Sequence, residues 1–156
     1  KELDLIASMQ PTHATSDKNM AEDRVGSQRI KGAYAWQSFL AQGTIVASGS
    51  DFPVESANPF LGIYASITRK DVQENPLNGW YPEEAMNRIQ TLKSFTIDAA
   101  YAGFQEGVLG SLEPGKWADF IIIDQDIVTV PDSTLWQTKV LETWVAGKKV
   151  FDRSKE

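Results

Sequence analysis

Two side chains that can do chemistry follow two short apolar runs in the first third of the sequence. Asp51 comes just after the run at residues 44–48, and His13, the sole histidine, comes after the run at residues 3–9. In parallel α/β folds the loops converge at the carboxyl ends of the strands, so reactive groups collect there. A carboxylate in such a place can bind a metal ion or transfer a proton. For each residue an alternative without a functional role stays open. Asp51 can cap the next turn through backbone N–H groups, and His13 can be a loop histidine with no role.

The segments around these residues predict alternating strands and helices. Residues 3–9 and 44–48 have the length and apolar content of buried strands. Residues 14–28 are polar and favour an exposed loop. Three later segments carry apolar residues at helical spacing: residues 29–43, residues 58–69, and a stretch that begins at Pro82 and runs to about Tyr101. This order is typical of parallel strands joined by crossover helices.

The last third of the chain changes in character. Residues 107–115 are punctuated by glycine and proline, and residues 120–123 form an aromatic and β-branched run. Residues 140–151 have Val, Thr, Trp and Val around an Ala-Gly turn, which predicts a terminal hairpin. We therefore expect an α/β part at residues 1–105 and a β-rich part at residues 106–156.

Composition excludes several classes of function. The chain has 156 residues, 42% of them hydrophobic, and a net charge of −6, which opposes binding to nucleic acid because phosphates need clustered Lys and Arg. No apolar run approaches the roughly 20 residues of a membrane-spanning helix, so no membrane partner is predicted. Cysteine is absent, which removes thiolate chemistry and leaves the cytoplasm as the default compartment.

A series of motifs along the chain resembles one family. In order these are QPTH at residues 10–13, GSDFPV at 49–54, NPF at 58–60, GSLEPGKWADFIIID at 110–124 and TWVAGKKVF at 143–151. Together they resemble the C-terminal part of the amidohydrolase superfamily. More narrowly they are similar to amidohydrolase family 3, which includes N-substituted formamide deformylases and proteins labelled exoenzyme regulatory proteins.

The resemblance implies a metal-dependent hydrolase built on a (β/α)₈ TIM barrel, with a β-sandwich formed by strands from both ends of the full-length chain. Asp51 matches the aspartate that closes the eighth barrel strand, binds the metal and passes a proton from the activated water to the leaving group. His13 matches the seventh strand, where we expect a substrate-binding role. Trp80, on a loop, is a candidate for the substrate entrance. Arg29 is the first choice for recognising an anionic substrate group through its bidentate fork, although any one arginine is more often solvated at the surface.

The sequence also departs from the family pattern. The remaining metal ligands of the family, a His-x-His pair, a central carboxylate or modified lysine and two further histidines, are not in this sequence. A catalytic zinc site usually needs three protein ligands, and a whole barrel needs about 250 residues. We therefore expect a fragment with the last two βα units of the barrel and the C-terminal strands of the sandwich. We expect a divalent metal, zinc by preference, in the full-length parent, no tightly bound metal in the fragment, and a homo-oligomer formed through exposed sheet edges.

Three hypotheses about function remain. The parent protein hydrolyses a C–N bond of an amide or formamide-like small molecule, and the fragment alone is inactive. Alternatively, the protein is a non-enzymatic regulatory or binding protein that keeps the amidohydrolase fold. In the third hypothesis the chain is a stand-alone β-rich module. The first is our working hypothesis, because the motif series covers nearly the whole chain.

Overall fold

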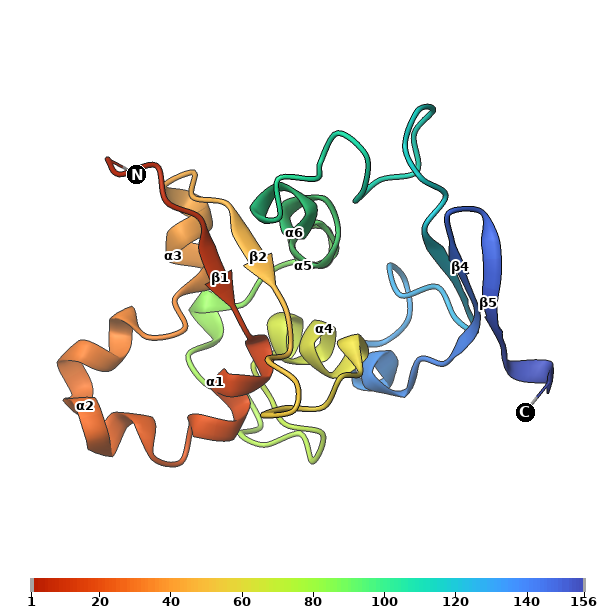
Figure 1. Ribbon diagram of the computed structural model, residues 1–156. Coiled ribbons are helices and arrows are strands. Elements are labelled where there is room, and N and C mark those ends of the chain that lie inside the picture. The colour runs from red at the N-terminus through yellow and green to blue at the C-terminus, as the bar shows by residue number, and fades with distance from the viewer. Residues whose placement is uncertain (1, 156) are drawn as a thin grey trace.

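The computed structural model describes residues 2–155 and has a mixed α/β architecture (Figure 1). The strands are β1 (Ala7–Met9), β2 (Val46–Ser48), β3 (Phe120–Ile123), β4 (Val140–Val145) and β5 (Lys148–Asp152). The helices are α1 (Pro11–Asp17), α2 (Ala21–Arg29), α3 (Trp36–Ala41), α4 (Pro59–Thr68), α5 (Arg88–Phe95) and α6 (Ile97–Ala102). The 3₁₀ segments are η1 (Ile30–Gly32), η2 (Pro82–Glu84), η3 (Asp132–Gln137) and η4 (Arg153–Lys155).

β1 and β2 form a parallel pair, as the sequence predicts. Their register places Ala7 opposite Val46 and Met9 opposite Ser48. Both strands are shorter than the apolar runs that predict them, and Leu3 and Leu5 before β1 are exposed. In Figure 1, α3 lies beside β1, and α5 and α6 lie beyond β2. The pair therefore ends on one side at the open edge of β1.

β3, β4 and β5 form a separate antiparallel sheet in that order. β4 and β5 make the predicted hairpin around Ala146 and Gly147, and Gly147 has the left-handed φ of 73° that this turn needs. Phe120 of β3 stacks on Trp144 of β4 with ring centroids 5.5 Å apart. This sheet lies at the opposite end of the molecule from α2 (Figure 1).

The prediction of an exposed loop at residues 14–28 is wrong, because α1 and α2 occupy most of this segment. α1 begins at Pro11, whose fixed φ suits the first turn of a helix. α2 is polar on nearly all sides. It carries Glu22 and Asp23 in its first turn, where negative charges interact favourably with the positive end of the helix dipole. Gly26, with φ 81°, interrupts the helix. A helix with so little apolar surface leaves no periodic signal in the sequence.

The predicted helix from Pro82 to Tyr101 begins later than expected. Residues Pro82–Glu84 form only a 3₁₀ segment, and α5 starts at Arg88. The start is set by a capping box in which the Asn87 side chain accepts from the Gln90 backbone and the Gln90 side chain accepts from the Asn87 backbone. Glu84 instead accepts a hydrogen bond from the backbone N–H of Ser38 in the first turn of α3.

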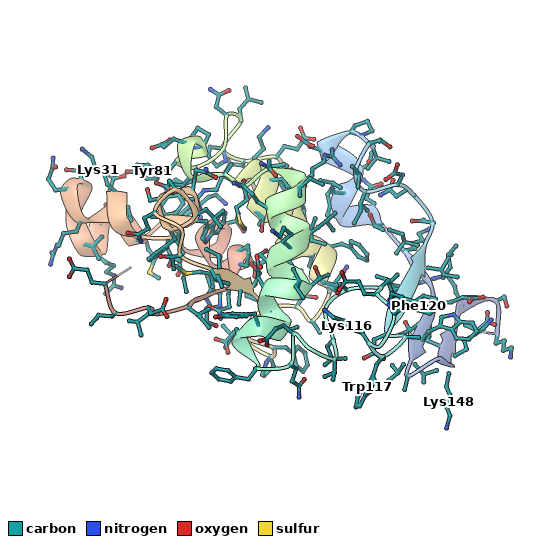
Figure 2. All side chains as sticks on the ribbon, turned by 90° about the horizontal axis from the view of Figure 1, so that it is seen from above. Lys31, Tyr81, Lys116, Trp117, Phe120 and Lys148 are labelled. Carbon is teal, nitrogen blue, oxygen red and sulfur yellow. The ribbon has the colours of Figure 1, made fainter. Side chains whose placement is uncertain are left out.

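The core of the α/β part lies between α1, α3 and the segment before α5. Ala14, Trp36 and Met86 pack together there and are almost completely buried. Trp117 is 58% exposed and lies with Phe120 and Lys148 at the end of the C-terminal sheet, far from Lys31 and Tyr81 (Figure 2). Within residues 2–155, none of the helices has the length and apolar content required to cross a membrane.

Candidate active site

Asp51 lies near the start of the loop that follows β2. Its backbone has the left-handed φ of 56°, uncommon for a residue other than glycine, although aspartate tolerates it better than most. The turn after it is closed by Val54, whose N–H donates to the Asp51 carbonyl at 2.8 Å. The N–H of Phe52 donates to the Ser50 hydroxyl at 3.3 Å. Residues held in unusual conformations cluster at functional sites, so this turn favours a functional role for Asp51.

His13 lies on the first turn of α1, immediately after β1. Its backbone N–H donates to the carbonyl of Gln10 at 3.0 Å, which starts the helix. Its Nε2 is buried, has no hydrogen-bond partner among the described residues, and lies 3.9 Å from Oδ2 of Asp51. The structure therefore brings together the two side chains that the sequence singles out, at a distance too long for a direct hydrogen bond.

The parallel pairing of β1 and β2 explains why these residues meet. Met9 and Ser48 are partners at the carboxyl ends of the two strands, and the N–H of Gly49 donates to the Met9 carbonyl at 3.0 Å. Both chains therefore leave the sheet at the same edge. The end of β2 is tied to α5 by the Ser48 hydroxyl, which donates to the Ser94 hydroxyl at 2.9 Å.

The other two predicted site residues lie in different surroundings. Trp80 packs against Tyr34 and Tyr81, with ring centroids 5.6 and 5.1 Å away, and is partly buried. Arg29 is exposed at the end of α2, and its Nε donates to the carbonyl of Val25 on the same helix at 2.8 Å. The roles proposed for both in substrate binding remain predictions.

Two further features of the structure have no clear signal in the sequence. Phe52 and Val54 project from the turn after Asp51 and are 68% and 69% exposed. They provide an apolar surface beside the carboxylate. Arg69, expected to be solvated, is completely buried at the end of α4. Full burial of an arginine is rare, so the residue type alone predicts an exposed position for Arg69.

The described residues do not complete a metal site. Among residues 2–155, no group of three or more His, Cys, Asp and Glu side chains could hold a metal ion. Asp51 and His13 offer one carboxylate and one imidazole, whereas a catalytic zinc site usually takes three protein ligands. The pair can hold or move a proton and can contact a substrate, and no step of a reaction through a metal follows from these residues alone.

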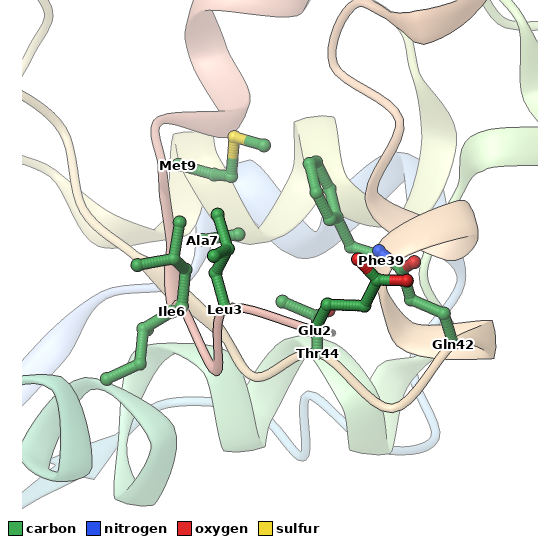
Figure 3. Close-up of a pocket in the computed structure, with 9 residues that line it drawn as sticks. Glu2, Leu3, Ile6, Ala7, Met9, Phe39, Gln42 and Thr44 are labelled. Carbon is green, nitrogen blue, oxygen red and sulfur yellow. The ribbon is translucent and has the colours of Figure 1, made fainter.

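A separate groove of about 640 Å³ lies at the open edge of β1, and neither His13 nor Asp51 lines it. Figure 3 shows Leu3, Ile6 and Ala7 on one side of this groove and Phe39 of α3 on the other. Its lining is largely apolar, and it lies between α3 and the segment of β1. Because neither His13 nor Asp51 lines it, this groove lies outside the candidate active site.

The fold of this chain is similar to part of known metal-dependent hydrolases. The crystal structure of an uncharacterized metal-dependent hydrolase from Pyrococcus furiosus matches with a TM-score of 0.69 and 32% sequence identity, covering 82% of this chain and 25% of that chain. The model of the amidohydrolase family matches residues 1–151. The chain belongs to this family.

Curated relatives agree with this family. The protein LONG AFTER FAR-RED 3 of Arabidopsis thaliana is 34% identical over 96% of this chain and 25% of its own length. The N-substituted formamide deformylase of Arthrobacter pascens is 30% identical over 76% of this chain and 21% of its own length. The chain spans about a quarter of the length of these relatives.

Proposed function

We propose that this chain is the C-terminal portion of a metal-dependent amidohydrolase that hydrolyses the C–N bond of an amide or formamide-like small molecule. Membership of the amidohydrolase family supports hydrolysis at the coarse level. The likeness to a protein whose name is N-substituted formamide deformylase supports the narrower bond type. The observation that carries the proposal is the approach of His13 Nε2 to Asp51 Oδ2, 3.9 Å apart at the carboxyl ends of two parallel strands.

In this proposal β1 and β2 are the last two strands of a TIM barrel. Two things support it: the strands are parallel, with helices following each of them, and the matching Pyrococcus furiosus hydrolase is about four times longer than the aligned region. Residues 1–105 would then belong to the barrel and residues 106–156 to the accompanying β-sandwich. Ligand sites of such barrels lie at the carboxyl ends of the strands, where Asp51 and His13 lie.

The roles follow from the chemistry of the side chains. Asp51 is exposed and carries a carboxylate, which can accept a proton from an attacking water and return it to the leaving nitrogen. His13 and Trp80 would contact the substrate, and Arg29 an anionic group on it. The family's divalent metal, zinc by preference, would activate the water and would need ligands beyond the residues described here.

The isolated chain is expected to show no hydrolase activity and no tight, stoichiometric zinc binding. The physical reason is that one carboxylate and one imidazole cannot supply a complete zinc site. Isothermal titration calorimetry of wild type and Asp51→Ala with zinc checks this. Submicromolar zinc bound by the wild type and lost in Asp51→Ala would contradict the proposal that the remaining ligands come from outside this chain.

We also propose that the isolated chain associates with itself through the open edge of β1. An unpaired strand edge beside an apolar groove is prone to pairing, and Leu5 in this groove is 67% exposed. Light scattering coupled to size-exclusion chromatography is expected to show a dimer or larger species. Leu5→Lys should shift it toward monomer, whereas Leu112→Lys, at a leucine 72% exposed outside this groove, should not. A monomer at high wild-type concentration would refute self-association.

A further inference from the structure

We infer that Arg69 is a positioning residue: it joins the segments of Tyr34 and Trp80 directly, and through Tyr34 and Trp36 it holds the helix that carries His13. The identity of Trp80 and His13 as parts of an active site rests on the proposed function. The contacts themselves are properties of this chain alone. Arg69 follows the last turn of α4, and its side chain reaches away from α4 into the space between the Tyr34 and Trp80 segments.

The Arg69 guanidinium joins segments that are far apart in the sequence. Its Nε donates to the Trp80 carbonyl at 2.7 Å, and its Nη1 donates to the Tyr34 carbonyl at 2.9 Å. Its Cζ lies 4.2 Å from the ring centroid of Trp36 and 5.3 Å from that of Trp80. The backbone also takes part, because the Trp80 N–H donates to the Arg69 carbonyl at 2.8 Å. The planar fork therefore fixes both partners in direction as well as distance.

Stability alone is a poor explanation for this arginine. The side chain is completely buried, and no ion pair to it is found within residues 2–155. Its Nη2 has no hydrogen-bond partner there, and burial lowers the pKa of the guanidinium to about 10. A buried charge with unmet hydrogen bonds opposes folding, and apolar replacements of buried ionic groups are often neutral or stabilising. A demand for fixed geometry accounts for the residue better.

The backbone around Arg69 supports this interpretation. Tyr34, Arg69 and Tyr81 have left-handed φ angles of 53°, 56° and 48°. Such conformations cost free energy for residues other than glycine and persist where surrounding contacts enforce them. The two carbonyl groups that Arg69 binds belong to Tyr34 and to Trp80, the neighbour of Tyr81. Its donors therefore hold the unfavourable turns in place.

Two contacts carry this restraint to His13. The hydroxyl of Tyr34 donates to the carboxylate of Asp17, the last residue of α1. Burial, together with this hydrogen bond, raises the pKa of Tyr34 to about 12, so the donor proton is retained at neutral pH. The ring of Trp36, against which Arg69 stacks, packs on Ala14, the residue after His13. Helix α1 therefore contacts Tyr34 through Asp17 and Trp36 through Ala14, and Arg69 contacts both Tyr34 and Trp36.

The isolated chain offers a direct test because it contains one histidine. The imidazole C2–H of His13 gives a single, unambiguous proton NMR signal. At one fixed pH, Asp51→Asn is expected to move this signal, because the carboxylate it removes is 3.9 Å from Nε2. In a chain that carries Arg69→Met, the same Asp51→Asn change is expected to lose most of its effect, because His13 no longer lies beside residue 51.

Arg88→Met is the matched control. The Arg88 guanidinium also donates to two backbone carbonyls, those of Ile127 and Val130, but it ties α5 to the segment before η3. It should lower the unfolding midpoint in urea and leave the Asp51-dependent shift of His13 unchanged. Two milder changes should each reduce that shift. Arg69→Lys keeps the positive charge but lacks the planar guanidinium, and Tyr34→Phe removes only the hydrogen bond to Asp17.

The outcomes separate positioning from bulk stability. A folded Arg69→Met chain that keeps the full Asp51-dependent shift overturns the inference. If circular dichroism shows that Arg69→Met does not fold, Arg69→Lys and Tyr34→Phe decide, and an unchanged shift in both overturns it equally. The His13 signal can be measured whether or not the protein catalyses a reaction. A complete protein without hydrolase activity would therefore reject the proposed function and leave this inference to be judged on the His13 signal.

Discussion

Asp51→Asn in the complete amidohydrolase is expected to lower kcat by about 10²–10⁴-fold, the usual contribution of a positioned acid–base group. Asparagine has nearly the same size and tolerates the left-handed φ of 56° found at this position. The turn closed by the N–H of Val54 depends only on the backbone carbonyl of residue 51 and is retained. The amide cannot accept a proton as the carboxylate does, so the loss should fall on the chemical step.

Steady-state kinetics on an N-substituted formamide, with the fold checked by circular dichroism, measures this effect. Asp23→Asn is the matched control, because Asp23 is exposed on α2 and has no place in the proposed chemistry. It should leave kcat within a factor of about two, since surface substitutions away from such features change little. Equal rates for Asp51→Asn and Asp23→Asn would show that Asp51 serves only the turn.

Trp36→Ala is expected to cost about 3–5 kcal/mol of unfolding free energy, the range for truncating a large aromatic side chain in a core. Trp36 has no exposed surface and packs against Ala14 and Met86. The guanidinium of Arg69 lies over its ring, so the substitution also leaves a buried cation without one of its two aromatic neighbours. The indole N–H has no hydrogen-bond partner among the described residues, so the loss comes from packing.

Urea denaturation of Trp36→Ala beside Trp117→Ala measures the difference. Both changes remove an indole, but Trp117 is 58% exposed and its loss should cost far less. A Trp36→Ala chain as stable as Trp117→Ala would mean that the cluster of Ala14, Trp36 and Met86 does not form the core of this part of the molecule.

The strand elements could be predicted because their signals are local. Short apolar runs predict β1 and β2, and the alternation of strand and helix predicts that they are parallel. The β-branched and aromatic residues around Ala146 and Gly147 predict the hairpin of β4 and β5. The polar helix α2 has no apolar stripe, so no periodic pattern predicts it. The start of α5 does have a local signal, because Asn87 and Gln90 have the spacing of a capping box.

The candidate site could be predicted only in part. The position of Asp51 and His13 at strand ends follows from the sequence, and the structure places them 3.9 Å apart. The burial of Arg69 does not follow, because it depends on contacts with Tyr34 and Trp80 that lie 35 and 11 residues away. Long-range contacts of this kind leave no periodic pattern. The exposure of Phe52 beside the pair does not follow from the sequence either, because an aromatic residue type favours burial.

Anomalous X-ray diffraction from crystals of the complete protein grown with zinc tests most directly whether Asp51 faces the reaction centre. The expected result is a metal peak about 2.0–2.2 Å from a carboxylate oxygen of Asp51, the usual zinc–oxygen distance, with His13 beside it. A fully occupied peak bound only by other residues, with the Asp51 carboxylate turned toward solvent, would contradict the proposal.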